Sequence, residues 1–145
     1  MNTQDMQKAL DEAVQDVFET MFFMFPEPLG KDDTAPWVSE LIFLARVGLK
    51  NTPHAVVLHA SETLAHHMAA AIIGTDRPIP EAEVLDVLKE AVNMVGGCLV
   101  TFLNLHKQVS LDVPQAERLD SSPLLKSATV YDVDGELLCS GIVVG

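Results

Sequence analysis

The hydrophobic residues of this chain repeat with two different periods, and the change between them most constrains the fold. Up to Phe22 the apolar residues recur every three or four positions, which is typical of one face of an α-helix. From Val109 onward apolar and polar residues alternate, as in half-buried strands, and Asp134-Gly135 suits a type I′ hairpin turn. Helical and strand-like segments are segregated, which favours an α+β fold with a largely antiparallel sheet.

About three helices, two hairpins and one further strand are expected. Pro26 ends the first helix because proline cannot continue the backbone hydrogen bonds, Ser61 suits an N-cap, and Gly74 suits a C-terminal stop. The predicted helices are Leu10–Phe22, Ser61–Ile73 and Pro80–Leu103, and the predicted strands are Trp37–Leu49, His54–His59, Val109–Val113, Lys126–Val133 and Leu137–Val144.

Length and composition limit the classes of protein to consider. A chain of 145 residues favours one domain, residues 1–145, and 48% hydrophobic residues suffice for a sizeable core. No apolar run approaches the roughly 20 residues of a membrane helix, so no membrane insertion is expected. The formal net charge of -12 argues against nucleic acid, whose binding needs Lys and Arg at the phosphates. The partner is expected to be a protein or a small molecule.

The N-terminus and the cysteines indicate a cytoplasmic protein. The first residues, MNTQDMQKALDEAVQD, are acidic and lack the basic and apolar regions of a signal peptide. Cys98 and Cys139 are the only cysteines and form no CxxC pair, which suits a reduced chain better than a disulfide framework.

The predicted helix Pro80–Leu103 has two chemically different faces. At about 100° per residue, four residues fall within roughly 60° of one another: Asp86, Glu90, Asn93 and Gly97. The opposite face is apolar and comprises Val84, Leu88, Ala91, Val95 and Phe102. One face is therefore expected to pack in the core, while a stripe of two acids, an amide and a glycine faces solvent. Spacing alone is also compatible with a stripe that only solvates the helix.

Two adjacent glycines, Gly96 and Gly97, are unusual inside a helix. Each costs about 1 kcal/mol relative to alanine, so either the helix ends there or something approaches its surface closely. The apolar period continues through Leu99 and Phe102, which favours the second interpretation. A glycine one turn beyond Asn93 would leave a shallow platform beside the amide.

The histidines and one cysteine form a rival candidate site. His54 and His59 lie an odd number of positions apart, on opposite strand faces, and the adjacent His66 and His67 point about 100° apart on a helix. Neither pair suits chelation, so surface or packing roles are predicted. Cys98 is predicted to be a buried, inert thiol on the inner side of its helix. The single tryptophan, Trp37, is expected to serve packing or a dimer contact.

The segment from Asp86 to Gly97 resembles the D/S-xxx-E-xx-N signature of the CheC, CheX and FliY phosphatases. Its ending, Asn93-Met94-Val95-Gly96-Gly97, is similar to the N-M-x-x-G wording of CheX sequences. The predicted elements also follow the family's order over nearly the whole chain. CheC-like members carry two copies of the signature, whereas the other candidate here, residues 16–23, lacks Glu and Asn in register. Pro114 fills the place of a family proline at a slightly shorter spacing. One site per chain is the CheX arrangement.

This resemblance implies a phosphatase that hydrolyses the phospho-aspartate of a CheY-like receiver domain in chemotaxis signalling. Asn93 would then hold the attacking water, Glu90 would pair with the receiver's active-site lysine, and Asp86 and Gly97 would contact the partner. No metal or cofactor is expected on this chain, because the Mg²⁺ would belong to the receiver. The resemblance also implies a homodimer whose sheets join.

Two other functions remain open at this point. One is a non-catalytic CheX-like module that docks a receiver domain or a flagellar switch component through the same residues. The other, a histidine-based metalloenzyme, has weaker support.

Overall fold

The computed structural model describes residues 3–29, 41–74, 77–105, 107–120 and 128–144. The helices in these ranges are α1 (Thr3–Val17), which continues as the π-helical turn η1 (Phe18–Phe22), α2 (Glu62–Ile73) and α3 (Glu81–Phe102). The strands are β1 (Glu27–Pro28), β2 (Phe43–Gly48), β3 (His54–Ala60), β4 (Gln115–Arg118), β5 (Thr129–Val133) and β6 (Glu136–Val144). The predicted positions Trp37, His106 and Lys126 lie outside the described residues.

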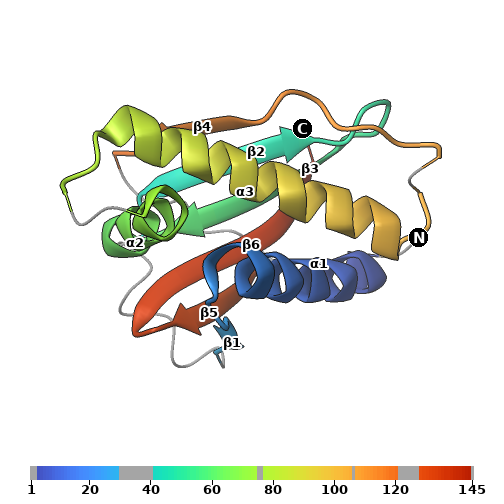
Figure 1. Cartoon of the computed structure of the whole chain (residues 1–145). Helices are drawn as coiled ribbons and strands as arrows, with labels where there is room; N and C mark the ends of the chain where they lie inside the picture. Colours follow the sequence, from blue (N-terminus) through green and yellow to red (C-terminus); the bar gives the residue numbers. More distant parts are fainter. Residues whose placement is uncertain (1–2, 30–40, 75–76, 106, 121–127, 145) are drawn as a thin grey trace.

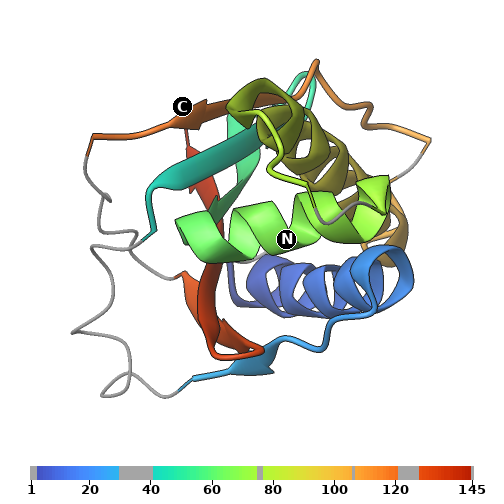
Figure 2. The same cartoon turned by 60° about the vertical axis from the view of Figure 1, so that its left-hand side comes forward.

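The strands form one antiparallel six-stranded sheet in the order β1-β5-β6-β3-β2-β4. The predicted hairpins β2–β3 and β5–β6 meet at its centre, where β3 pairs with β6. All three helices lie on one side of the sheet, with α3 along β2 and β3 (Figure 1), and the rotated view shows the same two layers (Figure 2). The predicted α+β fold with a largely antiparallel sheet is confirmed.

The predicted strand Val109–Val113 is wrong in its extent, because it makes only one isolated bridge, between Leu111 and Leu49. The regular strand, β4, follows Pro114 and begins with the pair Gln115–Arg46. Between these two pairs lie two residues of β2 but three residues of the opposing segment. The extra residue makes a β-bulge. The bulge shifts the alternation, so Leu111 packs against the core while Val113 is 83% exposed.

A partly buried polar network fixes α1 to the hairpin β5–β6. The Tyr131 hydroxyl donates to the carboxylate of Asp11 at 2.6 Å and lies 2.9 Å from the Ser140 hydroxyl. Gln7 donates to the same carboxylate at 3.0 Å and to Thr129 at 3.1 Å. Burial and the bond to Asp11 raise the pKa of Tyr131, so its proton stays available for donation. Directional bonds of this kind fix where the helix sits on the sheet.

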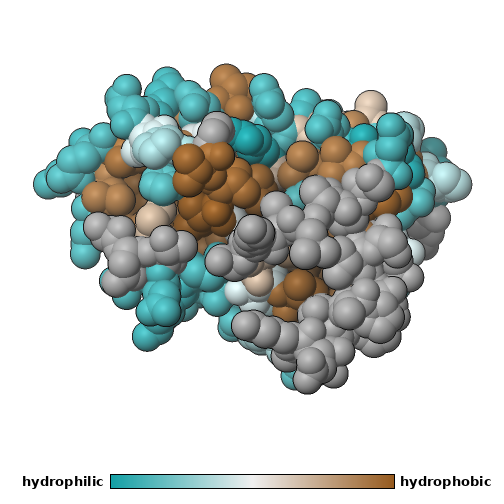
Figure 3. Space-filling view, turned by 180° about the vertical axis from the view of Figure 1, so that it is seen from behind, coloured by the Kyte–Doolittle hydropathy of each residue, from teal (hydrophilic) through white to brown (hydrophobic). Residues whose placement is uncertain are grey.

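The face of the sheet opposite the helices also carries hydrophobic residues (Figure 3). Leu41, Leu137 and Cys139 form a small buried cluster there. His59 lies opposite Cys139 in the register of β3 and β6 and is only 2% exposed. Burial lowers the pKa of His59, which favours the neutral imidazole, while a hydrogen bond with the Leu41 backbone works in the opposite direction. The predicted packing role is confirmed for this histidine.

The apolar face of α3 packs against the sheet as predicted, with one exception. Val84, Leu88, Ala91, Val95 and Leu99 are all 2% exposed or less. Phe102, which was expected among them, is 43% exposed because it is the last residue of α3 and lines a surface depression instead of the core.

The two glycines of α3 have opposite surroundings. A Cβ at Gly96 would lie 3.0 Å from a methyl group of Val47 and 3.3 Å from one of Leu111. Gly96 therefore allows α3 to approach β2 and the segment after α3 closely. A Cβ at Gly97 would meet no atom within 4 Å, so the fold itself does not require a glycine there.

These surroundings predict different effects of alanine at the two positions. Gly97→Ala is expected to raise the free energy of unfolding by about 1 kcal/mol, because alanine favours the helix. Gly96→Ala is expected to leave the free energy of unfolding unchanged or to lower it, because overpacking costs about 1–3 kcal/mol. Urea denaturation of the two variants and the parent measures the difference. Equal stabilities of the two variants would contradict the packing described for Gly96.

Candidate functional site

The four residues singled out on α3 lie along its solvent-facing side. Glu90 and Asp86 are exposed, and Asn93 and Gly97 are half-buried, while Val95 and Leu99 on the opposite side are fully buried. This is the burial that the helical spacing predicted. We call these four residues, Asp86, Glu90, Asn93 and Gly97, the α3 stripe.

The two central side chains of the stripe are free to bind a partner. Neither Glu90 nor Asn93 makes a side-chain hydrogen bond or ion pair with another residue of the described ranges. Asp86 lies 3.7 Å from the Lys89 ammonium in an exposed pair, which contributes little to stability. An amide with both donor and acceptor groups free, next to a free carboxylate, can hold a water molecule and a cation at the same surface.

Asn93 and Gly97 line an open depression of about 550 Å³ in the surface around the second half of α3. Its other lining residues come from α1, α3 and the segment after α3: Asp16, Met94, Cys98, Thr101, Phe102 and Leu111. The Thr101 hydroxyl donates to the Gly97 carbonyl oxygen at 3.0 Å, and both residues line the depression. The sequence predicted the platform at Gly97 but not the apolar residues around it.

Cys98 corrects one prediction. It was expected to be buried on the inner side of α3, but it is half-exposed and its thiol lies 3.8 Å from the Asp16 carboxylate of α1. Partial burial raises the pKa of Cys98, and Asp16 adds to the shift, so the reactive thiolate is disfavoured. Cys139 is buried, and burial raises the pKa of its thiol to about 12.

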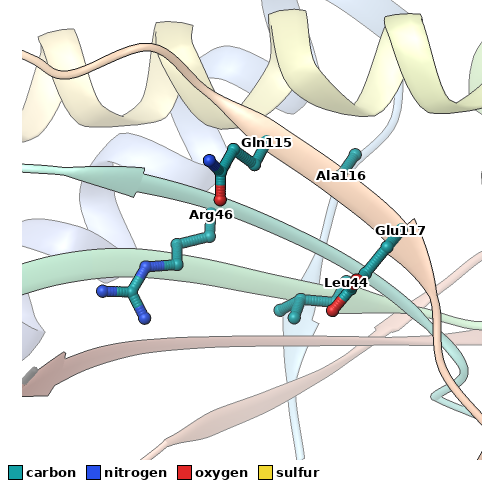
Figure 4. Close-up of a pocket in the computed structure, with 5 residues that line it drawn as sticks. All are labelled: Leu44, Arg46, Gln115, Ala116 and Glu117. Carbon is teal, nitrogen blue, oxygen red and sulfur yellow. The ribbon is translucent and has the colours of Figure 1, made fainter.

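A second, smaller pocket of about 210 Å³ lies between β2 and β4 (Figure 4). It is lined by Leu44, Arg46, Gln115, Ala116 and Glu117. Leu44 and Arg46 alternate along β2 with the buried Phe43, Ala45 and Val47, so they face away from the helices. This pocket therefore lies on the side of the sheet opposite the α3 stripe, and no pattern in the sequence indicated it.

The described residues contain no metal-binding cluster. Within them, no three His, Cys, Asp or Glu side chains converge as metal ligands would. His66 stacks edge-on against Phe43, with ring centroids 6.5 Å apart.

None of the helices seen in the described ranges combines the length and the apolar character of a bilayer-spanning segment.

Comparison with known proteins gives the same fold. Residues 43–125, more than half of the chain, match the family model described as chemotaxis phosphatase CheX. No match was found among curated proteins.

Solved structures are similar over nearly the whole chain at low sequence identity. The chemotaxis protein CheX from Vibrio vulnificus is 13% identical with a TM-score of 0.77, covering 99% of this chain and 100% of that one. The CheX protein from Desulfovibrio desulfuricans is 15% identical with a TM-score of 0.75, covering 97% of this chain and 99% of that one.

A third similar structure is that of a complex with CheY. A chain in the CheX-CheY-BeF3-Mg²⁺ complex from Borrelia burgdorferi is 18% identical with a TM-score of 0.68, covering 94% of this chain and 96% of that one. These structures agree with the chain in fold, and the family match, which covers α3 and its stripe, shows that the chain belongs to the CheX family of chemotaxis phosphatases.

Proposed function

We propose that this protein hydrolyses the phospho-aspartate of a CheY-like receiver domain and carries one active site, on α3. The observation that carries the proposal is the pair Glu90 and Asn93, both free of partners within the described residues and both on the exposed α3 stripe. Membership of the CheX family and the relative solved in complex with CheY support it. Free thiols and a receiver substrate fit a cytoplasmic location.

In this mechanism, Asn93 positions the water that attacks phosphorus. The water oxygen forms a bond to phosphorus in line with the aspartyl oxygen, whose bond to phosphorus breaks, giving inorganic phosphate and a free carboxylate. The Asn93 amide can accept a hydrogen bond from the water and does not titrate, so it orients the water over a wide pH range. Catalysis then depends on position more than on acid–base chemistry.

Glu90 lies one helical turn before Asn93 and is proposed to pair with the active-site lysine of the receiver. This pairing would fix the register of docking and draw the lysine away from the phosphoryl group. Asp86, one turn further, would lie at the rim of the contact and guide docking. Mg²⁺ would be bound by the receiver and would neutralise charge on the phosphoryl oxygens.

The alternative is a module that docks a receiver or flagellar switch component through the α3 stripe without hydrolysis. The same pair on the exposed stripe, Glu90 and Asn93, would serve docking alone as well as catalysis. The lifetime of a phosphorylated receiver separates the two functions, because only the enzyme shortens it.

We also propose that the protein forms a homodimer in which two sheets join at β4. The edge strand β1 has two residues and ends in Pro28, which has no N–H to donate. At the other edge, Leu119 donates to the Ile42 carbonyl oxygen at 2.7 Å, and bonds to β2 alternate along an antiparallel pair. The backbone groups of Ala116 therefore point away from β2, towards a second copy.

Ala116→Pro tests this dimer. The substitution removes an N–H that points to the open edge and leaves the pairing of β4 with β2 intact, so we expect a folded monomer. The parent and Ala116→Val, which keeps the N–H, should both give particles of about twice the 15.8 kDa chain mass in light scattering at micromolar concentration. A parent particle of single-chain mass would exclude the dimer.

Asn93→Ala tests the role of the amide. The residue lies on the exposed side of α3, so its truncation should change stability by less than about 0.5 kcal/mol. We expect binding of the receiver to persist, and the catalysed rate of phospho-receiver decay to fall about 100-fold at saturating enzyme, because the water is no longer positioned. Decay at the parent rate with a folded variant would exclude this mechanism and favour the docking module.

Glu90→Ala tests the proposed pairing with the receiver's lysine. Its loss should weaken binding as well as turnover, unlike Asn93→Ala, because a charge pair fixes the docked register. Added salt should also weaken binding of the receiver to the parent protein, and should weaken its binding to Glu90→Ala less. Titration calorimetry at two ionic strengths measures both effects. An unchanged Kd for Glu90→Ala would show that the carboxylate makes no contact with the receiver.

A further inference from the structure

Gly97 leaves a gap in the ridge of side chains along the exposed face of α3. One turn before it stands Asn93, and one turn after it stands Thr101, so the ridge is interrupted between two polar residues. A Cβ at Gly97 would meet no atom within 4 Å, so nothing within the described residues fills this gap. We call the gap and its surroundings the Gly97 notch.

The notch has apolar walls. Met94 and Phe102, on α3, are both 43% exposed, and both line the same depression as Gly97. Leu111, which the β-bulge turns towards α3, lines it as well. Single exposed apolar side chains are normal on a monomer, but Met94 and Phe102 line one depression together with the half-buried Leu111, and this apolar surface gains free energy when it is covered.

The position of the notch determines what covers it. Gly97 lies about one helical turn, or roughly 5–6 Å, from Asn93. A receiver whose phosphoryl group reaches Asn93 buries about 800 Å² of each partner in an interface of ordinary size, so it also covers Gly97. The centre of such an interface is apolar in most complexes, and the polar α3 stripe alone does not provide an apolar centre.

We propose that the Gly97 notch receives an apolar side chain from the docking face of the receiver, with Met94, Phe102 and Leu111 as its walls. This inference rests on the proposed function and adds to it a determinant of which receiver is bound. Glu90 and Asn93 act on groups that are common to receivers, whereas the shape of the notch selects the side chain that fits.

Alkylation of Cys98 tests whether the receiver covers the notch. Cys98 lines the depression and is half-exposed, whereas Cys139 is 4% exposed, so N-ethylmaleimide should react first at Cys98. A CheY-like receiver loaded with beryllofluoride and Mg²⁺, at about ten times its Kd, should slow this reaction about tenfold. Cys98→Ser gives the background labelling. Unchanged labelling in the presence of bound receiver would overturn the proposal.

Substitutions in the notch test its fit to the receiver. Gly97→Leu adds a side chain at a position where a Cβ would meet no atom within 4 Å, and should raise the Kd for the beryllofluoride-loaded receiver at least about tenfold. Met94→Ala should raise the Kd about fivefold, because it removes one of the apolar side chains that line the notch. Ile72→Ala removes a side chain of 46% exposure on α2 and serves as the matched control. Parent-like Kd values for Gly97→Leu and Met94→Ala would overturn the proposal.

These measurements separate the notch from the catalytic mechanism. Beryllofluoride is not hydrolysed, so binding is measured without turnover. A parent protein that binds the receiver, with the predicted loss in Gly97→Leu, but never shortens phospho-receiver lifetime would support the notch and exclude the phosphatase. Normal turnover by the parent protein, with a parent-like Kd for Gly97→Leu, would support the phosphatase and exclude the notch. Protection of Cys98 by a higher concentration of the protein itself would assign the notch to a second copy and overturn the proposal.

Discussion

The close contact of α3 with β2 at Gly96 determines how the rest of the molecule presents the α3 stripe. With no side chain at this position, the helix lies against Val47 and Leu111, and its apolar face is fixed towards the sheet. Because side-chain direction in a helix follows from its rotation, fixing one face also fixes the opposite one. The outward position of Glu90 and Asn93 is thus a result of packing on the other side of the helix, some distance from either residue.

The sequence predicted the part of this arrangement that depends on one helix. The spacing of Glu90, Asn93 and Gly97 places them on one face in any regular α-helix, and the burial of Val95 and Leu99 agrees with that spacing. The fold class could also be predicted, because the hairpins and helices are separated along the chain. The family resemblance added the proposed chemistry, which spacing alone could not distinguish from a solvated surface.

Features that depend on contacts between distant segments were not predictable in the same way. The alternation at Val109–Val113 suggested a regular strand, but the bulge before β4 exposes Val113, while Val109 and Leu111 pack against the core. Phe102 continues the helical period of apolar residues, but the core does not extend as far as this residue. Cys98 faces Asp16 of α1, a neighbour that no local pattern reveals. The walls of the depression therefore come from segments whose meeting is decided by tertiary packing.

The different surroundings of the two adjacent glycines have a consequence for how such a protein diverges. Gly96 is restricted by the interior, whereas Gly97, Met94 and Phe102 lie where substitution leaves the core intact. Duplicated copies of the gene could therefore change at the surface around Gly97 and acquire different signalling partners, while the same scaffold and the same amide at Asn93 are inherited. Cross-talk between parallel pathways in one cell would then be reduced by a few surface changes that need no compensating mutation inside the protein.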